Sequence, residues 1–139
     1  MTDAYQTPGS DVSVDSGVAE QMTLKEIYFS FEGRVPRKVF WLHGVLAMMG
    51  YVLVLLLVAG GLWQVSGALG AIVAIAGLVI LIWASLAVQV KRWHDRDKSG
   101  WWVLLPLIPF IVGIWQLVET GFLEGSNGSN RFGPHPAEY

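Results

Sequence analysis

Residues 39–90 read VFWLHGVLAMMGYVLVLLLVAGGLWQVSGALGAIVAIAGLVILIWASLAVQV, and this stretch contains no Asp, Glu, Lys or Arg. The whole chain of 139 residues is 53% hydrophobic and only 14% charged, whereas an average soluble domain has about 25% charged residues. A soluble domain of this size has too little interior to bury such a run. A lipid bilayer can solvate it, so the stretch predicts an all-α integral membrane protein.

A turn-like patch around Gly60, Gly61 and Ser66 divides the apolar stretch into two parts. We therefore expect transmembrane helices over about 39–63 and 67–90. At 1.5 Å per residue, about 25 residues extend about 37 Å. This length crosses a hydrocarbon core of about 30 Å with some tilt.

A third apolar segment follows the polar residues 91–100. We expect a third transmembrane helix over 101–122, bent by Pro106 and Pro109, because each proline removes a backbone amide donor. The alternative is a re-entrant loop, which would return the tail to the side from which the segment entered. In that case, the backbone freed at membrane depth would need partners within the protein.

The segments that flank these helices are polar. The spacing of Thr23 and Glu26 is typical of a capping box and predicts a short amphipathic interfacial helix over 23–33. The alternative is an extension packed on the protein's own membrane helices. The predicted organisation is a disordered tail over 1–22, a membrane domain over 23–123, and a Gly-, Ser-, Asn- and Pro-rich tail of turns over 124–139.

The basic residues predict the orientation of the chain in the membrane. Four precede the first span, four lie in the loop over 91–98, and the tail contains only Arg131. Short loops rich in Lys and Arg stay in the cytoplasm. Three spans with a cytoplasmic N-terminus place eight of the nine basic residues in the cytoplasm and the tail on the opposite side.

Three motifs occur in order along the chain: EGRVPRKVFW over 32–41, KRWHDRDKSGWW over 91–102 and NRFGPHP over 130–136. Over about residues 24–136 the chain resembles the bacterial inner-membrane family known as domain of unknown function 805, also called YhaH-like. The family often has Ser at the position of Pro36 and Leu at that of Trp93. The resemblance implies a multi-pass inner-membrane protein and no established activity.

Basic and aromatic side chains form a collar on the expected cytoplasmic face. Indole rings suit the headgroup level of a bilayer, and cations suit its phosphates. We assign contact with the membrane interface, with headgroups or with a partner protein to Arg34, Arg37, Lys38, Trp41, Arg92, His94, Asp95, Trp101 and Trp102.

Adjacent His94 and Asp95 suggest acid–base chemistry or metal binding. A metal site needs three or four converging ligands, and the other histidines, His43 and His135, lie elsewhere in the chain. We therefore expect no metal, no cofactor and no catalytic residue. His43 lies about one turn inside the first span and is expected to reach the interface. The carboxylates of the loop are expected to form ion pairs, Asp95 and Asp97 with Arg92, Arg96 or Lys98.

Small residues lie along one face of the second expected span, where they would let another helix approach closely. The partner would be the chain's own first or third helix, or a second copy of the protein. These helix-packing residues are Gly67, Gly70, Ala71, Ala74 and Gly77. The tail carries a separate motif, Asn130, Arg131, Phe132 and Gly133, which lacks the context of a phosphate-binding loop.

These features favour a non-enzymatic interaction, scaffold or lipid-contact module in the bacterial inner membrane. The expected partners are the lipid bilayer, including anionic headgroups, and a second copy or another membrane protein. Nucleic acid is not expected, because the basic residues are few and lie at the membrane. The alternatives are an oligomeric transport or channel component and a membrane enzyme that acts on lipid headgroups through His94 and Asp95.

Overall fold

The computed structural model describes residues 21–107 and 111–137, and over these residues the fold is all-helical. The expected disordered tail lies almost wholly outside the described residues, as does Pro109. The helical elements are α1 (Leu24–Phe29), α2 (Arg37–Val39), η1 (Phe40–Leu46), α3 (Ala47–Val65), α4 (Gly67–Asp95), η2 (Gly100–Leu107), α5 (Ile111–Leu117) and η3 (Val118–Phe122).

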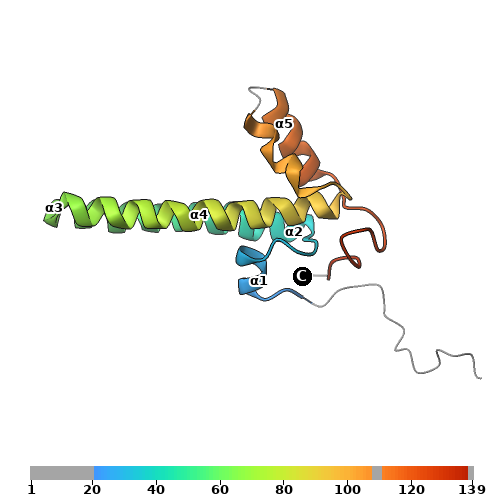
Figure 1. Ribbon diagram of the computed structural model, residues 1–139, viewed down its shortest axis with the longest axis horizontal. Coiled ribbons are helices and arrows are strands. Elements are labelled where there is room, and N and C mark those ends of the chain that lie inside the picture. Colours follow the sequence, from blue (N-terminus) through green and yellow to red (C-terminus); the bar gives the residue numbers. More distant parts are fainter. Residues whose placement is uncertain (1–20, 108–110, 138–139) are drawn as a thin grey trace, which may run out of the picture.

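Two long helices lie side by side and form a rod (Figure 1). The first runs without a break over Arg37–Val65, through α2, the π-helical η1 and α3, and the second is α4. Each has 29 residues and is long and apolar enough to cross a membrane. A helix of this length extends about 43 Å, which exceeds a hydrocarbon core of about 30 Å. The charged end of the rod can therefore stand in the headgroup layer while the rest crosses the bilayer.

The turn between α3 and α4 is a single residue, Ser66. Its backbone is extended, and its Oγ accepts a hydrogen bond from the amide of Leu69, which caps the first turn of α4. Directly after the turn, Gly70 lies so close to α3 that a Cβ atom there would stand 2.8 Å from the backbone of Ala59 and Trp63. The hydroxyl of Tyr51 donates to the carbonyl of Gly77 at 2.9 Å. Small residues on α4 thus bring the two helices into close contact.

The outer surface of the rod is apolar over most of its length. Leu57 on α3 is 77% exposed, and large side chains such as Leu53, Ile72 and Ile75 also point outward. Water would not solvate a surface of this kind on a stable monomer. Lipid chains are the matching environment for it.

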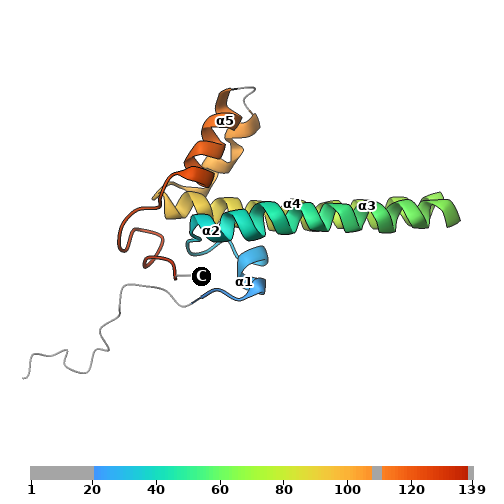
Figure 2. The same cartoon turned by 180° about the vertical axis from the view of Figure 1, so that it is seen from behind.

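The third apolar segment differs from the expected single helix over 101–122. It forms a 3₁₀ helix, η2, and a second helical piece, α5 with η3, which lie side by side with the rings of Trp102 and Trp115 5.7 Å apart. Figures 1 and 2 show this hairpin leaving the rod on one side, near the end of α4. The expectation of one continuous helix is therefore incorrect. Pro106 lacks the amide that such a helix would need, and it lies near the end of η2.

The tail also lies elsewhere than expected. Because the third segment turns back, residues 124–137 return to the end of α4 and pack beside the loop after it. The side-chain amide of Asn130 donates to the carbonyl of His94 at 2.8 Å. The tail therefore lies at the basic end of the rod, as the re-entrant alternative predicts, and not at the opposite end.

Helix α1 is shorter than the expected helix over 23–33. The capping box is present, since Thr23 Oγ1 accepts from the amide of Glu26 and the Glu26 carboxylate accepts from the amide of Thr23. The helix ends at Phe29, with Ser30 as its C-cap. It lies against α4 on the side of the rod away from the hairpin (Figure 1). Ile27 on its inner face is buried with Val35, Val39 and other residues in the main hydrophobic cluster.

Candidate functional site

All charged side chains of the described residues lie at one end of the rod. Residues 39–90 and 99–118 contain no charged side chain. The remaining segments meet where the first long helix begins, at Arg37, and where α4 ends (Figure 2). This end combines α1, the linker before α2, the last turn of α4, the base of the hairpin and the tail. Among the described residues, the charged side chains are therefore gathered at this end.

A buried carboxylate lies at the centre of this end. Asp95 accepts a hydrogen bond from Arg34 Nε at 3.0 Å, and it also forms an ion pair with Arg92, one turn earlier on α4. The Asp95 side chain is only 4% exposed, and both guanidinium groups are buried with it. We call these three residues the arginine clamp. Removing one partner from such a set leaves an uncompensated buried charge, which is strongly unfavourable.

Backbone carbonyls satisfy the remaining donors of the two arginines. Arg34 donates to the carbonyls of Ser126 and Gly128, both at 2.7 Å. Arg92 donates to the carbonyls of Thr120 and Leu123. Each guanidinium therefore ties the end of α4 to a segment distant in sequence, Arg34 to the tail and Arg92 to the base of the hairpin.

Gly125 allows the tail to pass directly over the clamp. A Cβ atom at this position would collide with the carboxylate of Asp95. The amide of the next residue, Ser126, donates to the carbonyl of Asp95 at 2.7 Å. Only a residue without a side chain fits at this point.

Lys91 holds α1 in a similar way. Its Nζ donates to the carbonyls of Glu26, Ile27 and Ser30 at 2.5, 2.6 and 2.6 Å, and the residue is fully buried. The last carbonyls of a helix lack intrahelical partners and carry the negative end of its dipole. The ammonium group therefore caps α1 and fixes it against α4.

Replacing Lys91 with methionine should release α1 while leaving the rest of the fold in place. Methionine fills similar space but donates no hydrogen bond, and hydrogen bonds from charged groups contribute about 1.5–3 kcal/mol. Hydrogen–deuterium exchange should show the amides of Ile27 and Ser30 exchanging at least about tenfold faster. The exposed Lys25→Met variant on the same helix serves as the control. Equal exchange in the two variants would contradict the proposed role of Lys91.

A second ion cluster holds the base of the hairpin. Glu119 pairs with Arg96 at 2.9 Å and with Lys98 at 2.6 Å. Burial alone would raise the pKa of the Glu119 carboxyl, but the hydrogen bond from Lys98 and the charge of Arg96 outweigh burial and lower the pKa. Glu119 therefore stays ionised at neutral pH. Lys98 also lies between 5.1 and 5.6 Å from the ring centroids of three indoles, Trp93, Trp102 and Trp115.

His94 does not act together with the Asp95 carboxylate. Its Nδ1 donates to the carbonyl of Gly33 at 3.0 Å, and its ring stacks on Phe132 of the tail with centroids 4.0 Å apart. Asp95 meanwhile lies between the two arginines of the clamp. His94 and Asp95 are thus adjacent in sequence, but their side chains contact different groups and do not form an acid–base pair.

The expected contact with headgroups does not hold for three of the assigned residues. Arg34, Arg92 and Asp95 are buried and bonded to protein groups, so none of them can reach a lipid phosphate. Trp41 is half-buried and donates from Nε1 to the carbonyl of Gly121. Trp101 is different, because it is 79% exposed on η2. The other assigned residues, Arg37, Lys38 and Trp102, lie at the surface of the charged end.

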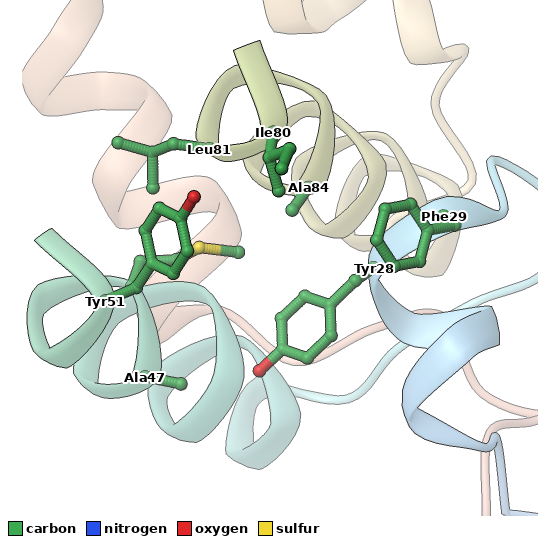
Figure 3. A pocket seen from close by; sticks show the side chains of 8 residues that line it. Tyr28, Phe29, Ala47, Tyr51, Ile80, Leu81 and Ala84 are labelled. Atoms are coloured by element: carbon green, nitrogen blue, oxygen red, sulfur yellow. The ribbon is translucent and has the colours of Figure 1, made fainter. Parts of the chain in front are cut away.

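His43 of η1 lies beside α1, where its Nδ1 is 2.8 Å from the hydroxyl of Tyr28. An apolar pocket of about 230 Å³ lies next to this contact, between α1 and the rod. Figure 3 shows Tyr28 and Phe29 of α1 facing Tyr51 of α3 across this pocket. The hydroxyl groups of both tyrosines have hydrogen-bonding partners, so the pocket presents no free polar side-chain group at these positions.

The small residues assigned to helix packing lie along α4. Gly70 and Gly77 are buried against α3, where Gly77 faces Leu55. Gly67 lies near the indole of Trp63 at the turn. Within the described chain, the partner that approaches these glycines is therefore the protein's own first long helix.

Lys91, Gly125 and Glu119 are central to the charged end but were not among the candidate residues. Glu119 carried a usable signal, because an isolated acidic residue in an apolar segment needs a partner. Lys91 and Arg92 are adjacent on a helix and so point about 100° apart, which indicates contacts with two different segments. We find no sequence signal for Gly125.

A family model described as "Protein of unknown function (DUF805)" matches residues 28–134. The chain belongs to the DUF805 family. The DUF805 match runs from α1 into the tail and includes the whole arginine clamp. The family unit therefore contains the tail as well as the helices.

Three DUF805 relatives come from Escherichia coli strain K12. The inner membrane protein YhaH is 43% identical over 111 residues, which cover 78% of this chain and 88% of YhaH. The inner membrane protein YhaI is 32% identical over 111 residues, covering 78% and 87%. The uncharacterized protein YiiR is 32% identical over 136 residues, covering 81% and 89%. No solved structure matches the chain significantly.

Proposed function

We propose that this protein is a non-enzymatic lipid-contact and scaffold module of the bacterial inner membrane. The observation that carries the proposal is that each charged group of the arginine clamp has partners within the protein. Its carboxylate is paired twice, and its two guanidinium groups bind protein carbonyls. A set of this kind stabilises the charged end of the rod, and its carboxylate is not available as a catalytic acid or base. The names of YhaH and YhaI support the inner-membrane location.

The proposed topology has two spans and a cytoplasmic N-terminus. The two long helices are the spans, and the basic residues at their shared end favour the cytoplasmic side. The hairpin of η2 and α5 returns to the same end, which supports an interfacial hairpin rather than a third span. Helix α1 lies at the same interface, and the tail is cytoplasmic.

The two alternative functions have less support. A membrane enzyme that uses His94 and Asp95 would need a free carboxylate, and Asp95 is committed to two arginines. A transport component would need a polar path, and residues 39–90 carry no charged side chain. Association with a second copy or with another membrane protein remains part of the proposed scaffold role.

Labelling of single cysteines tests the proposed topology, and the chain contains no natural cysteine to interfere. A membrane-impermeant maleimide added to intact spheroplasts should modify Gln64→Cys at the turn between the long helices. It should leave Lys25→Cys and Ser129→Cys unmodified until the membrane is inverted, because α1 and the tail are cytoplasmic. Modification of Ser129→Cys in intact spheroplasts would show a third span and would contradict the proposal.

A further inference from the structure

The hairpin leaves a groove between itself and α4. Because η2 diverges from the rod (Figure 1), a cavity of about 530 Å³ opens between them. Its walls are apolar, formed by Leu86 and Val90 of α4 and by Val103 and Leu104 of η2. The groove has the size of a small-molecule site, and its walls suit a hydrocarbon chain.

One end of the groove is polar and has a fixed geometry. His94 lies there, with Nδ1 donating to the carbonyl of Gly33 and the ring stacked on Phe132. A carbonyl only accepts hydrogen bonds, so Nδ1 carries the proton and Nε2 of the neutral ring is an acceptor. Nε2 lies 3.5 Å from the position that a Cβ atom on Gly100 would occupy. Since Gly100 and His94 both line the groove, this acceptor lies at its polar end.

The groove has the orientation of a lipid in the cytoplasmic leaflet. Its polar end at His94 lies at the level of the charged residues, and its apolar walls extend to Leu86, about 12 Å further into the rod at 1.5 Å per residue. A bound lipid would place its headgroup at His94 and its chain toward the centre of the bilayer. The pocket beneath α1 lacks an equivalent polar end, because both of its tyrosine hydroxyls have partners.

The charge around the polar end favours an anionic ligand. The guanidinium of Arg131 lies over the ring of Phe132, 5.0 Å from its centroid. The Arg131 side chain is 63% exposed and forms a loose ion pair with Asp97 at 3.4 Å, so it remains accessible.

We propose that this groove binds one molecule of an anionic phospholipid with a hydroxylated headgroup, namely phosphatidylglycerol. One acyl chain lies between α4 and η2, the headgroup hydroxyl donates to Nε2 of His94, and the phosphate lies against Arg131. This site rests on the proposed lipid-contact function and specifies its ligand.

Native mass spectrometry of the detergent-solubilised full chain tests this site. The protein is equilibrated with equal amounts of phosphatidylglycerol and phosphatidylcholine, which has neither a net charge nor a hydrogen-bond donor. The wild type should retain one phosphatidylglycerol in preference to phosphatidylcholine. Arg131→Gln should lower that preference about fivefold, the usual effect of one basic residue at an anionic surface. Equal retention of the two lipids by the wild type would overturn the proposal.

Two further variants locate the lipid within the groove. Leu86→Trp fills the space between α4 and η2 and should abolish the preference, whereas Leu57→Trp, on the outer surface of α3, should leave it unchanged. His94→Asn keeps a donor toward Gly33, removes the Nε2 acceptor and should weaken retention. Because this variant also loses the stack on Phe132, Leu86→Trp on α4 gives a result that does not depend on the tail. Equal preference in Leu86→Trp and Leu57→Trp would overturn the groove assignment.

Phosphatidylethanolamine, offered as a third lipid, tests the role of charge. It has a donor but no net charge, so it should be retained less than phosphatidylglycerol, and equal retention would overturn the anionic assignment. The cysteine labelling gives an independent readout. If the labelling confirms the proposed topology but the protein shows no lipid preference, only the groove assignment is overturned. If Ser129→Cys in the tail is labelled in intact spheroplasts, the topology is overturned.

Discussion

Replacing Asp95 with asparagine should destabilise the protein by about 3–5 kcal/mol, the usual cost of breaking a buried ion pair by removing one partner. The substitution preserves the size of the side chain but leaves Arg34 and Arg92 without a counter-charge. The tail and the hairpin should then separate from the end of α4. The free energy of unfolding in mixed micelles and the rate of proteolysis within the tail measure both effects.

Asp97→Asn is the matched control for this substitution. Asp97 lies two residues further along the same loop, and its side chain is 47% exposed beside Arg131. Exposed ion pairs contribute about 1 kcal/mol or less. Its backbone has a positive φ of 56°, a conformation that asparagine also tolerates. Similar losses of stability in the two variants would show that the buried clamp has no special role.

Replacing Gly70 with alanine should separate the two long helices at their turn. The added Cβ would stand 2.8 Å from the carbonyl oxygen of Ala59 and from the backbone of Trp63, and the backbone cannot move aside as a flexible side chain can. Overpacking of this kind costs about 1–3 kcal/mol. The same unfolding measurement in mixed micelles records the loss.

Gly60→Ala provides the comparison on α3. Apart from the local backbone of α3 itself, no atom of the described protein lies within 4 Å of a Cβ at this position, so the methyl group faces lipid. Alanine is the better helix former by about 1 kcal/mol, and this variant should be as stable as the wild type or more so. If Gly70→Ala were equally harmless, close packing at the turn would not be what holds the pair together.

Local features of the sequence predicted the local structure well. Thr23 and Glu26 form the capping box that their spacing indicates. The turn expected near Ser66 separates the two long helices. These helices extend beyond the expected spans, to Arg37 at the start of the first and to Asp95 at the end of the second. The ion pair of Arg92 with Asp95 joins residues one turn apart on a helix. Each of these features depends on neighbouring residues, whose identities the sequence states directly.

The hairpin could not be predicted in the same way. A segment of this length and composition is equally compatible with crossing a membrane and with turning back. The difference depends on contacts at its base, where Glu119 pairs with Arg96 and Lys98 and Arg92 binds the carbonyl of Thr120. A span would place the tail at the opposite end, because each crossing reverses the side of everything that follows, whereas the re-entrant alternative places it at the basic end.

The interior position of the clamp was also not evident from the sequence. Arg34 is separated from Asp95 by 61 residues and from Gly128 by 94. Most of its acceptors are backbone carbonyls, and these leave no pattern in side-chain identity. An arginine beside an aromatic motif at a membrane therefore suggests a headgroup contact.

The contacts of Arg34 also imply an order of assembly during synthesis. The two long helices are complete once Asp95 has been translated, so they can enter the membrane while the tail is still on the ribosome. Until the tail emerges, Arg34 lacks its carbonyl acceptors at Ser126 and Gly128. The unit at the charged end should therefore close last, after insertion, and a chain that terminated before Ser126 would leave Arg34 with Asp95 but without its carbonyl acceptors in the tail.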